Sequence, residues 1–154
     1  MKKLALLGVG GAALVGVALF GFTRGPAETE RVILLPDDAE VVALGKEVYD
    51  GNCASCHGAD LEGQPDWRSP GPDGRLPAPP HDETGHTWHH DGDTLFQLTK
   101  YGLADLIGDL EYESNMPAYE GVLSDDEIIA VLSYIKSTWP DEVRTIHDEI
   151  ENRQ

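Results

Sequence analysis

The chain is 154 residues long, enough for one compact domain of ordinary size. Its 28 Asp and Glu residues against 11 Lys and Arg give a formal net charge of -17, which excludes nucleic acids and anionic lipid surfaces as partners. A basic protein surface or a salty environment suits such a charge better. With 40% hydrophobic residues and three Trp, the chain is expected to fold rather than remain disordered.

The N-terminus predicts a membrane anchor. After Lys2 and Lys3, no charged residue occurs in Leu4–Phe22, which as a helix would be roughly 29 Å long, close to the hydrocarbon thickness of a bilayer. This run is longer than the apolar part of a usual signal peptide. We therefore expect residues 1–22 to be one transmembrane helix, an anchor or uncleaved signal. The alternative is a long signal peptide that is cleaved and releases a soluble protein.

The lysine pair orients this predicted anchor, because positive residues remain on the cytoplasmic side of a membrane. The rest of the chain is then outside the cytoplasm. Residues 23–36 are polar and contain two prolines, so they are expected to form a tether between the anchor and a folded domain.

Four later segments have the apolar periodicity of amphipathic helices, and no segment shows the sustained alternation of a strand. Ser124 and Glu127 form a capping box for the third of them, and Pro140 follows its end. The four predicted helices start at Asp37 or Asp38, near Asp93, at Ser124, and at Asp141.

The only two cysteines of the chain are Cys53 and Cys56, and His57 directly follows the second. A structural zinc site would need further ligands, a thioredoxin-like pair would need a preceding strand, and a disulfide across two residues would be strained. Covalent attachment of haem uses all three residues, because each thiol adds to a vinyl group and the histidine becomes the proximal iron ligand. We therefore predict one covalently attached haem c with these three residues at its site.

Met116 is the only methionine besides the initiator, and it lies in a polar loop next to Pro117. A thioether is a soft, neutral ligand that favours reduced iron, so Met116 is the predicted second axial ligand. The competitors are four histidines within one stretch of ten residues. One of them could bind the iron instead, or two or three could hold copper or zinc. These are His81, His86, His89 and His90, whereas His147 is expected at the surface.

With these motifs placed, residues 37 to about 140 resemble the class I cytochromes c, specifically small bacterial single-haem members that are membrane-anchored or secreted. The resemblance rests on "GKEVYDGNCASCHG", "LPAPP", "DTLFQLTKYG", "NMPAY" and "LSDDEIIAVLSYIKS". It implies an all-α cytochrome c fold in residues 37–140, with three main helices plus a C-terminal helix around one haem. Residues 141–154 are then a C-terminal acidic helix or tail.

The same resemblance implies two close contacts. The backbone carbonyl of Pro77, Pro79 or Pro80 should accept a hydrogen bond from His57. Gly45, which costs about 1 kcal/mol relative to alanine inside a helix, should mark a close crossing with the last family helix near Tyr134. The chain departs from the family between His57 and Asp93, where a long segment carries the histidines together with Trp67 and Trp88. Either tryptophan could lie against the porphyrin.

Two protein ligands leave the iron no open position, so the expected function is one-electron transfer and not catalysis. The resemblance implies a carrier of a respiratory or photosynthetic chain, which shuttles electrons between membrane redox complexes on the periplasmic side of the bacterial cytoplasmic membrane. Between Lys100 and Lys136 there are eight acidic residues and no basic one, which favours donor and acceptor partners with basic docking surfaces. The alternative is a haem c module with a copper-handling, metal-handling or ligand-sensing role of the His81–His90 loop.

Overall fold

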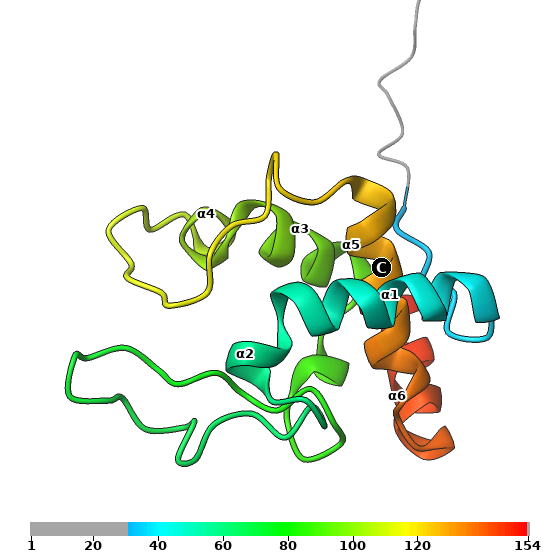
Figure 1. Ribbon diagram of the computed structural model, residues 1–154, viewed down its shortest axis with the longest axis horizontal. Helices are drawn as coiled ribbons and strands as arrows, with labels where there is room; N and C mark the ends of the chain where they lie inside the picture. Colours follow the sequence, from blue (N-terminus) through cyan, green and yellow to red (C-terminus); the bar gives the residue numbers. More distant parts are fainter. Residues whose placement is uncertain (1–30, 154) are drawn as a thin grey trace, which may run out of the picture.

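The computed structural model describes residues 31–153, and this part of the chain is helical (Figure 1). Its only β pairing is an isolated bridge between Glu120 and Leu123. None of the helices in this range is long and apolar enough to cross a bilayer. The predicted anchor, 1–22, and the first part of the predicted tether lie outside the described residues. The elements are α1 (Ala39–Asn52), α2 (Ala54–His57), the 3-10 turn η1 (Thr87–His89), α3 (Gly92–Tyr101), α4 (Leu103–Ile107), α5 (Asp125–Ser137) and α6 (Asp141–Glu151).

The frame of the domain is the crossing of α1 over α5 (Figure 1). Of the two candidate caps, Asp38 begins α1, since its carboxylate accepts hydrogen bonds from the backbone N–H of Glu40 and Val41. The predicted capping box begins α5. The helices approach so closely that a Cβ on Gly45 would lie 2.0 Å from the carbonyl oxygen of Ala130 and 2.8 Å from the Cβ of Tyr134. The close crossing at Gly45 is confirmed.

The remaining helices complete one hydrophobic core. Apolar side chains of α1, α3 and α5 meet there, together with Leu34 before α1 and Trp139 after α5. Helix α3 begins slightly earlier than predicted because Asp91 caps it by accepting from the backbone N–H of Thr94 at 2.9 Å. The core comprises Leu34, Val48, Tyr49, Leu61, Leu95, Phe96, Ile128, Val131, Leu132, Ile135 and Trp139.

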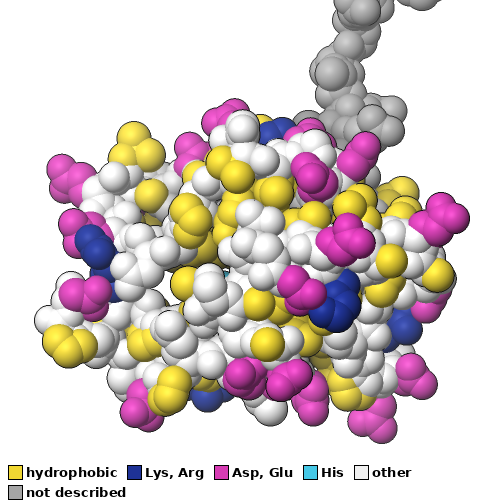
Figure 2. Space-filling model, in the orientation of Figure 1, with side chains coloured by type: hydrophobic (Ala, Val, Ile, Leu, Met, Phe, Trp, Pro, Cys, Tyr) yellow, Lys and Arg dark blue, Asp and Glu magenta, His cyan; other side chains and the backbone are white. Residues whose placement is uncertain are grey.

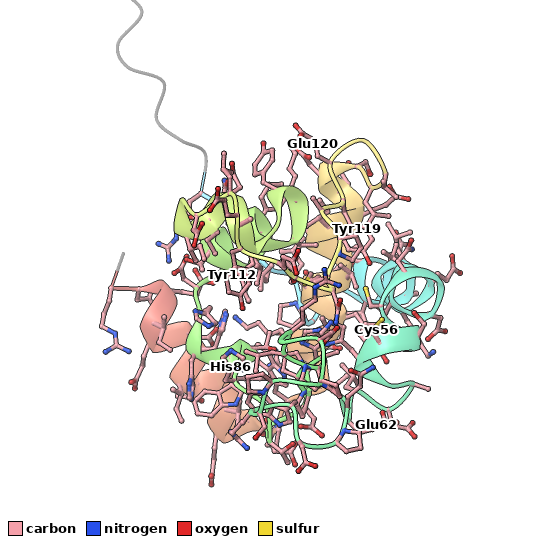
Figure 3. All side chains as sticks on the ribbon, turned by 90° about the vertical axis from the view of Figure 1, so that its left-hand side faces the viewer. Cys56, Glu62, His86, Tyr112, Tyr119 and Glu120 are labelled. Atoms are coloured by element: carbon pink, nitrogen blue, oxygen red, sulfur yellow. The ribbon has the colours of Figure 1, made fainter. Side chains whose placement is uncertain are left out.

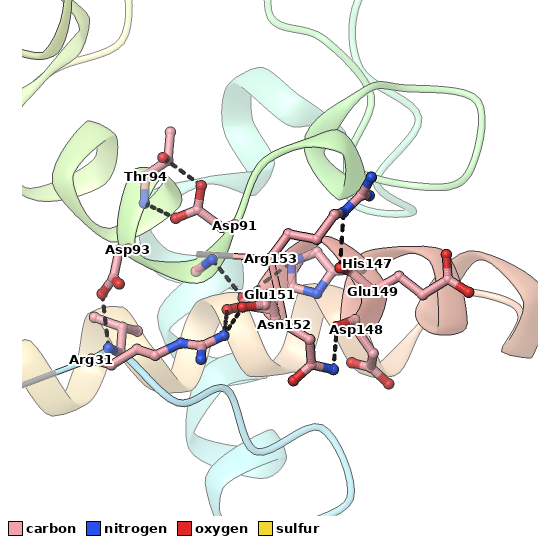
Figure 4. Close-up of polar contacts among 12 residues, drawn as sticks. Arg31, Asp91, Asp93, Thr94, His147, Asp148, Glu149, Glu151, Asn152 and Arg153 are labelled. Atoms are coloured by element: carbon pink, nitrogen blue, oxygen red, sulfur yellow. Dashed lines mark hydrogen bonds and ion pairs between the residues drawn. The ribbon is translucent and has the colours of Figure 1, made fainter.

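Residues 31–36, the last part of the predicted tether, are packed onto the domain. The backbone N–H of Val32 donates to Asp93 at 2.8 Å, and that of Leu35 donates to the hydroxyl of Ser133 at 2.9 Å. Helix α6 secures the same segment, because Glu151 accepts hydrogen bonds from Arg31 and from the backbone N–H of Gly92 (Figure 4). The folded unit therefore begins before the first predicted helix.

The expectation that His147 is a surface residue is wrong. Its side chain is 0% exposed, and its ring lies 5.2 Å from that of Trp139. The Nε2 atom is 3.6 Å from a carboxylate oxygen of Glu151, in the same network that Figure 4 draws. Helix α6 thus has a buried face, which its acidic sequence obscures.

Candidate cofactor site

The cysteine motif forms a single helical turn directly after α1. Cys53 ends α1 and caps α2, and the backbone N–H of His57 donates to the carbonyl oxygen of Cys53 at 2.9 Å. Residues three apart on a helix lie on the same side, so this turn places Cys53 and Cys56 together. Both thiols are free, and Cys56 is exposed. The arrangement presents two sulfur atoms and a histidine from one short stretch.

Burial and the neighbouring Cys56 raise the pKa of the Cys53 thiol to about 11. A thiol with a raised pKa remains neutral at pH 7, whereas redox-active cysteines and metal-binding thiolates have lowered pKa values. The microenvironment of Cys53 therefore does not suit a thioredoxin-like pair.

The His57 ring is held in one orientation by Pro79. His57 is 7% exposed, and its Nδ1 lies 2.8 Å from the carbonyl oxygen of Pro79. A carbonyl only accepts hydrogen bonds, so Nδ1 carries the proton and Nε2 keeps a free lone pair. Burial lowers the pKa of His57, which keeps this lone pair unprotonated at neutral pH. Of the three candidate prolines the structure selects Pro79, and the ring is prepared to bind a metal through Nε2.

His81 supports His57 from one side. The two rings are stacked with centroids 4.0 Å apart and planes inclined by 22°. The Nδ1 of His81 lies 2.8 Å from the hydroxyl oxygen of Thr87, and the backbone carbonyl of His81 accepts from the indole of Trp139 at 2.8 Å. Burial lowers the pKa of His81 well below its usual value, so this ring is neutral. His81 is a packing residue that supports the ring of His57.

The other three histidines of the cluster are engaged in ring contacts. His86 stacks on Trp67 at 5.3 Å and meets His90 edge to face at 5.5 Å, while His89 packs against Trp88 at 3.7 Å. Within residues 31–153, no group of three or more His, Cys, Asp or Glu side chains is arranged to hold a metal ion. The histidines, adjacent in sequence, are therefore distributed to different packing positions.

The surface beside the motif has the apolar character that a porphyrin requires. Figure 2 shows a hollow between the upper and lower parts of the molecule, with hydrophobic side chains around it, and in Figure 3 Cys56, His86 and Tyr112 lie around an open space. Exposed apolar side chains are concentrated on α4 and the loop after it, where Leu106, Ile107 and Leu110 are 39, 51 and 80% exposed. Such a concentration normally marks a binding surface.

Met116 lies in the loop between α4 and α5, which extends on the same side of the molecule as the loop after α2 (Figure 1). Its backbone N–H donates to the hydroxyl of Ser114 at 3.1 Å. Met116 is partly buried, while every other residue from 109 to 118 is exposed. The loop thus turns the methionine toward the protein and its polar neighbours toward solvent.

Tyr119 fixes the end of this loop, a role that the sequence did not indicate. Its hydroxyl donates to the carbonyl oxygen of Asn52, directly before Cys53, at 2.8 Å, and its side chain is 8% exposed. Burial raises the pKa of this phenol, and the nearby Cys53 and Cys56 add to the shift. The aromatic residue in "NMPAY" is a local signal for an anchor, but its partner 67 residues away is not visible in the sequence.

The surface on the Met116 side is acidic. Lys100 is paired with Asp125 at 2.6 Å, which neutralises the single lysine that α3 contributes. Figure 2 shows acidic side chains distributed over the visible face. The exposed acidic residues between α3 and the first turn of α5 are Asp105, Asp109, Glu111, Glu113, Glu120, Asp125 and Asp126.

Comparisons with known proteins place this site in a family. The family model described as Cytochrome c matches residues 42–139, which include the motif, Met116 and the α1–α5 crossing. The segment that precedes residue 42 and helix α6 lie outside the match. No solved structure matches the chain significantly.

Three curated proteins illustrate the similarity. The chain is 35% identical over 98 residues to the cbb3-type cytochrome c oxidase subunit CcoP of Azospirillum sp. (strain B510), covering 64% of this chain and 29% of that protein. It is 37% identical over 71 residues to cytochrome c-555 of Prosthecochloris aestuarii, covering 42% and 72%. It is 30% identical over 95 residues to cytochrome c6 of Chlorolobion braunii, covering 61% of this chain and 86% of that protein. The chain thus spans less than a third of the CcoP subunit.

Proposed function

This chain belongs to the cytochrome c family and binds haem c covalently, and from this premise we propose that it is a carrier of single electrons. Cys53 and Cys56 would hold the haem through two thioethers, and His57 and Met116 would bind its iron. When bound, the haem supplies a metal that alternates between the ferrous and ferric states. The observation that carries the proposal is the His57 ring, which the Pro79 carbonyl fixes with its Nε2 lone pair free.

The residues around the site have distinct tasks in this function. Pro79 and His81 hold the His57 ring so that it does not rotate when the charge of the iron changes. Apolar side chains around the haem would exclude water from it, which favours the less charged, reduced state. Met116 adds a neutral ligand with the same preference.

Electron transfer rather than catalysis follows from this ligation. Two protein ligands fill both axial positions, so no substrate can reach the iron. The chain covers 72% of cytochrome c-555 and 86% of cytochrome c6, two small cytochromes, but only 29% of an oxidase subunit. The names of all three proteins are those of cytochromes or of a cytochrome c oxidase subunit, which supports electron transfer through haem c.

The acidic surface on the Met116 side is the proposed docking surface. Its exposed carboxylates would attract redox partners, both donor and acceptor, whose docking surfaces are basic. Between exposed charges this attraction is screened at high salt. The rate of electron transfer to such a partner should therefore fall as the ionic strength rises.

For localisation we propose a single-pass protein of the bacterial cytoplasmic membrane, with the haem domain on the periplasmic side. The support is the uncharged run Leu4–Phe22 and the lysine pair before it. Fractionation of cells that express the full chain tests this proposal, and the mass of the purified protein tests whether residues 1–22 are retained. A soluble protein that lacks these residues would contradict it.

The accessory metal role of the His81–His90 loop is not favoured. His81 is committed to packing beneath His57, and His86 to a stack with Trp67. Copper handling would need several of these rings to turn away from their neighbours.

Three measurements on the purified full chain test the carrier function. The colour should resist extraction with acidified acetone, as thioether attachment requires, and a redox titration should show one reversible one-electron transition. The reduced protein should not bind carbon monoxide readily at neutral pH. Extractable colour would contradict the attachment through Cys53 and Cys56, and ready binding of carbon monoxide would contradict the carrier role.

A further inference from the structure

One arginine bridges the two loops on either side of the site. Arg75 lies in the long loop after α2, and its guanidinium donates to the carboxylate of Glu113 at 3.0 Å and to the side-chain oxygen of Asn115 at 3.2 Å. Both acceptors lie in the loop of Met116, and Asn115 directly precedes it. Figure 1 shows these two loops extending on the same side of the molecule.

The other hydrogen bonds of the Met116 stretch are local. Tyr112 donates its backbone N–H to Asp109, Glu111 also bonds Asp109, and Met116 bonds Ser114. Among the described residues, the two Arg75 bonds are the only side-chain bonds that connect residues 110–118 to a different segment. The next fixed point is Tyr119, which already belongs to the packed part of the domain.

Arg75 is itself held in place. Its backbone N–H donates to the carboxylate of Asp73 at 3.1 Å, and its carbonyl oxygen accepts from Gly71 at 2.8 Å. Its side chain is 35% exposed, and the Nε atom is buried without a protein partner. The guanidinium thus projects from a tight, internally bonded turn, which sets the position of its planar fork.

We propose that Arg75 is a positioning residue that holds the Met116 loop closed over the site. This inference rests on the proposed ligation of iron by Met116. A planar guanidinium bonds two acceptors at once, so one side chain removes much of the conformational freedom of an exposed stretch. Without it the loop opens more often, and Met116 leaves the iron more often.

The two bonds do not contribute equally. The side chain of Glu113 is 70% exposed, and an ion pair that is so accessible to solvent stabilises little. The bond to Asn115 acts next to the ligand itself and fixes the direction of the chain there. Loss of the Asn115 bond should therefore matter more than loss of the Glu113 charge.

The test compares Arg75→Gln with a matched control, Arg68→Gln, in the full-length haem protein. Arg68 lies in the same long loop, is exposed, and stacks over Trp67 at 4.0 Å without reaching the Met116 loop. The measurement is the affinity of the ferric protein for added imidazole, which must displace Met116 to bind. We expect about a tenfold increase for Arg75→Gln and no change for Arg68→Gln.

Two further variants separate charge from geometry. Glu113→Gln should raise the affinity for imidazole by less than Arg75→Gln does. Arg75→Lys keeps the charge but has no fork, so it should restore only part of the wild-type behaviour. Full rescue by lysine, or equal affinities for Arg75→Gln and the wild type, would overturn the proposal.

Hydrogen exchange of the backbone amides in residues 110–118 distinguishes this inference from the ligation on which it rests. Faster exchange in Arg75→Gln than in Arg68→Gln supports the clamp whatever the iron ligand is, and unchanged exchange refutes it. If Met116→Ala leaves the affinity for imidazole unchanged, Met116 is not the displaced ligand. The proposed ligation is then wrong, and the role of Arg75 in retaining Met116 is wrong with it.

Discussion

The two predicted iron ligands are held in very different ways. His57 is buried in a helical turn, bonded to Pro79 and stacked on His81, so packing fixes it from several directions. Met116 belongs to an exposed stretch that a few polar bonds hold, with Arg75 the principal one. A ligand fixed by packing is prepared before the metal arrives, whereas one fixed by polar bonds at the surface can be released at moderate cost. We expect every exchange of ligand to occur on the Met116 side.

The largest effect on the His57 side is expected from a substitution at the crossing of α1 and α5, because α1 leads into the cysteine motif. In Gly45→Ala the new Cβ would meet the backbone oxygen of Ala130 at 2.0 Å, so the helices must separate. We expect the free energy of unfolding to fall by about 3 kcal/mol, the range of overpacked cores. Denaturant unfolding of the haem protein measures it.

Gly51→Ala is the matched control in the same helix. A Cβ at Gly51 has no neighbour within 4 Å, so alanine should stabilise the helix by about 0.5 to 1 kcal/mol. If the two variants changed stability by the same amount and in the same direction, close packing at Gly45 would not be what fixes α1.

A smaller effect is expected at the end of the Met116 loop. Tyr119→Phe removes the hydroxyl that donates to the carbonyl oxygen of Asn52 and should cost about 1 kcal/mol of unfolding free energy. Tyr112→Phe, which changes an exposed tyrosine of the same loop, is the control. A greater loss in Tyr112→Phe than in Tyr119→Phe would contradict the assignment of Tyr119 as the anchor.

The smallest predicted effect is a pH dependence at α6, remote from both ligands. Burial lowers the pKa of His147, Lys136 lowers it further, and the carboxylates of Glu151 and Asp148 oppose the shift. In the unfolded chain His147 therefore binds a proton at about pH 6.5, whereas in the folded protein it does so only at lower pH. The contribution of His147 to stability is complete above that pH and is lost as the pH falls below it.

His147→Gln should flatten this part of the stability profile, and His89→Gln, at an exposed histidine, should leave it as it is. Unfolding midpoints from pH 5 to 8 provide the comparison. An equal slope in wild type and His147→Gln would show that other groups cause the pH dependence.

The sequence predicted the structure around His57 well and the contacts of the Met116 loop less well. The capping box of α5 depends on two residues three positions apart and was found as predicted, and the close approach at Gly45, which the family resemblance implied, is also confirmed. The choice of Pro79 among three prolines required the fold, because only the path of the loop decides which carbonyl reaches His57. Periodicity tells which residues belong to a helix but not which loop residues meet.

The wrong expectation for His147 and the contacts that the sequence did not indicate have the same origin. His147 lies among acidic residues and looks exposed, yet α6 packs against η1 and the segment 31–36, neither of which is close in sequence. The histidines of the cluster were alternative ligand candidates because they are close in sequence, whereas in the fold His81 stacks on His57, His86 meets Trp67 and His90, and His89 packs against Trp88. The bridge from Arg75 to residues 113 and 115 spans about forty positions and left no local sign.

The near-infrared absorption of the ferric protein tests the ligation of iron by His57 and Met116 most directly, because a sulfur-to-iron charge-transfer band there reports a bound thioether. We predict that the wild type has this band, that Met116→Ala lacks it, and that His86→Ala, which removes a competing histidine, retains it. A Met116→Ala protein that kept the band, or a His86→Ala protein that lost it, would contradict the ligand assignment.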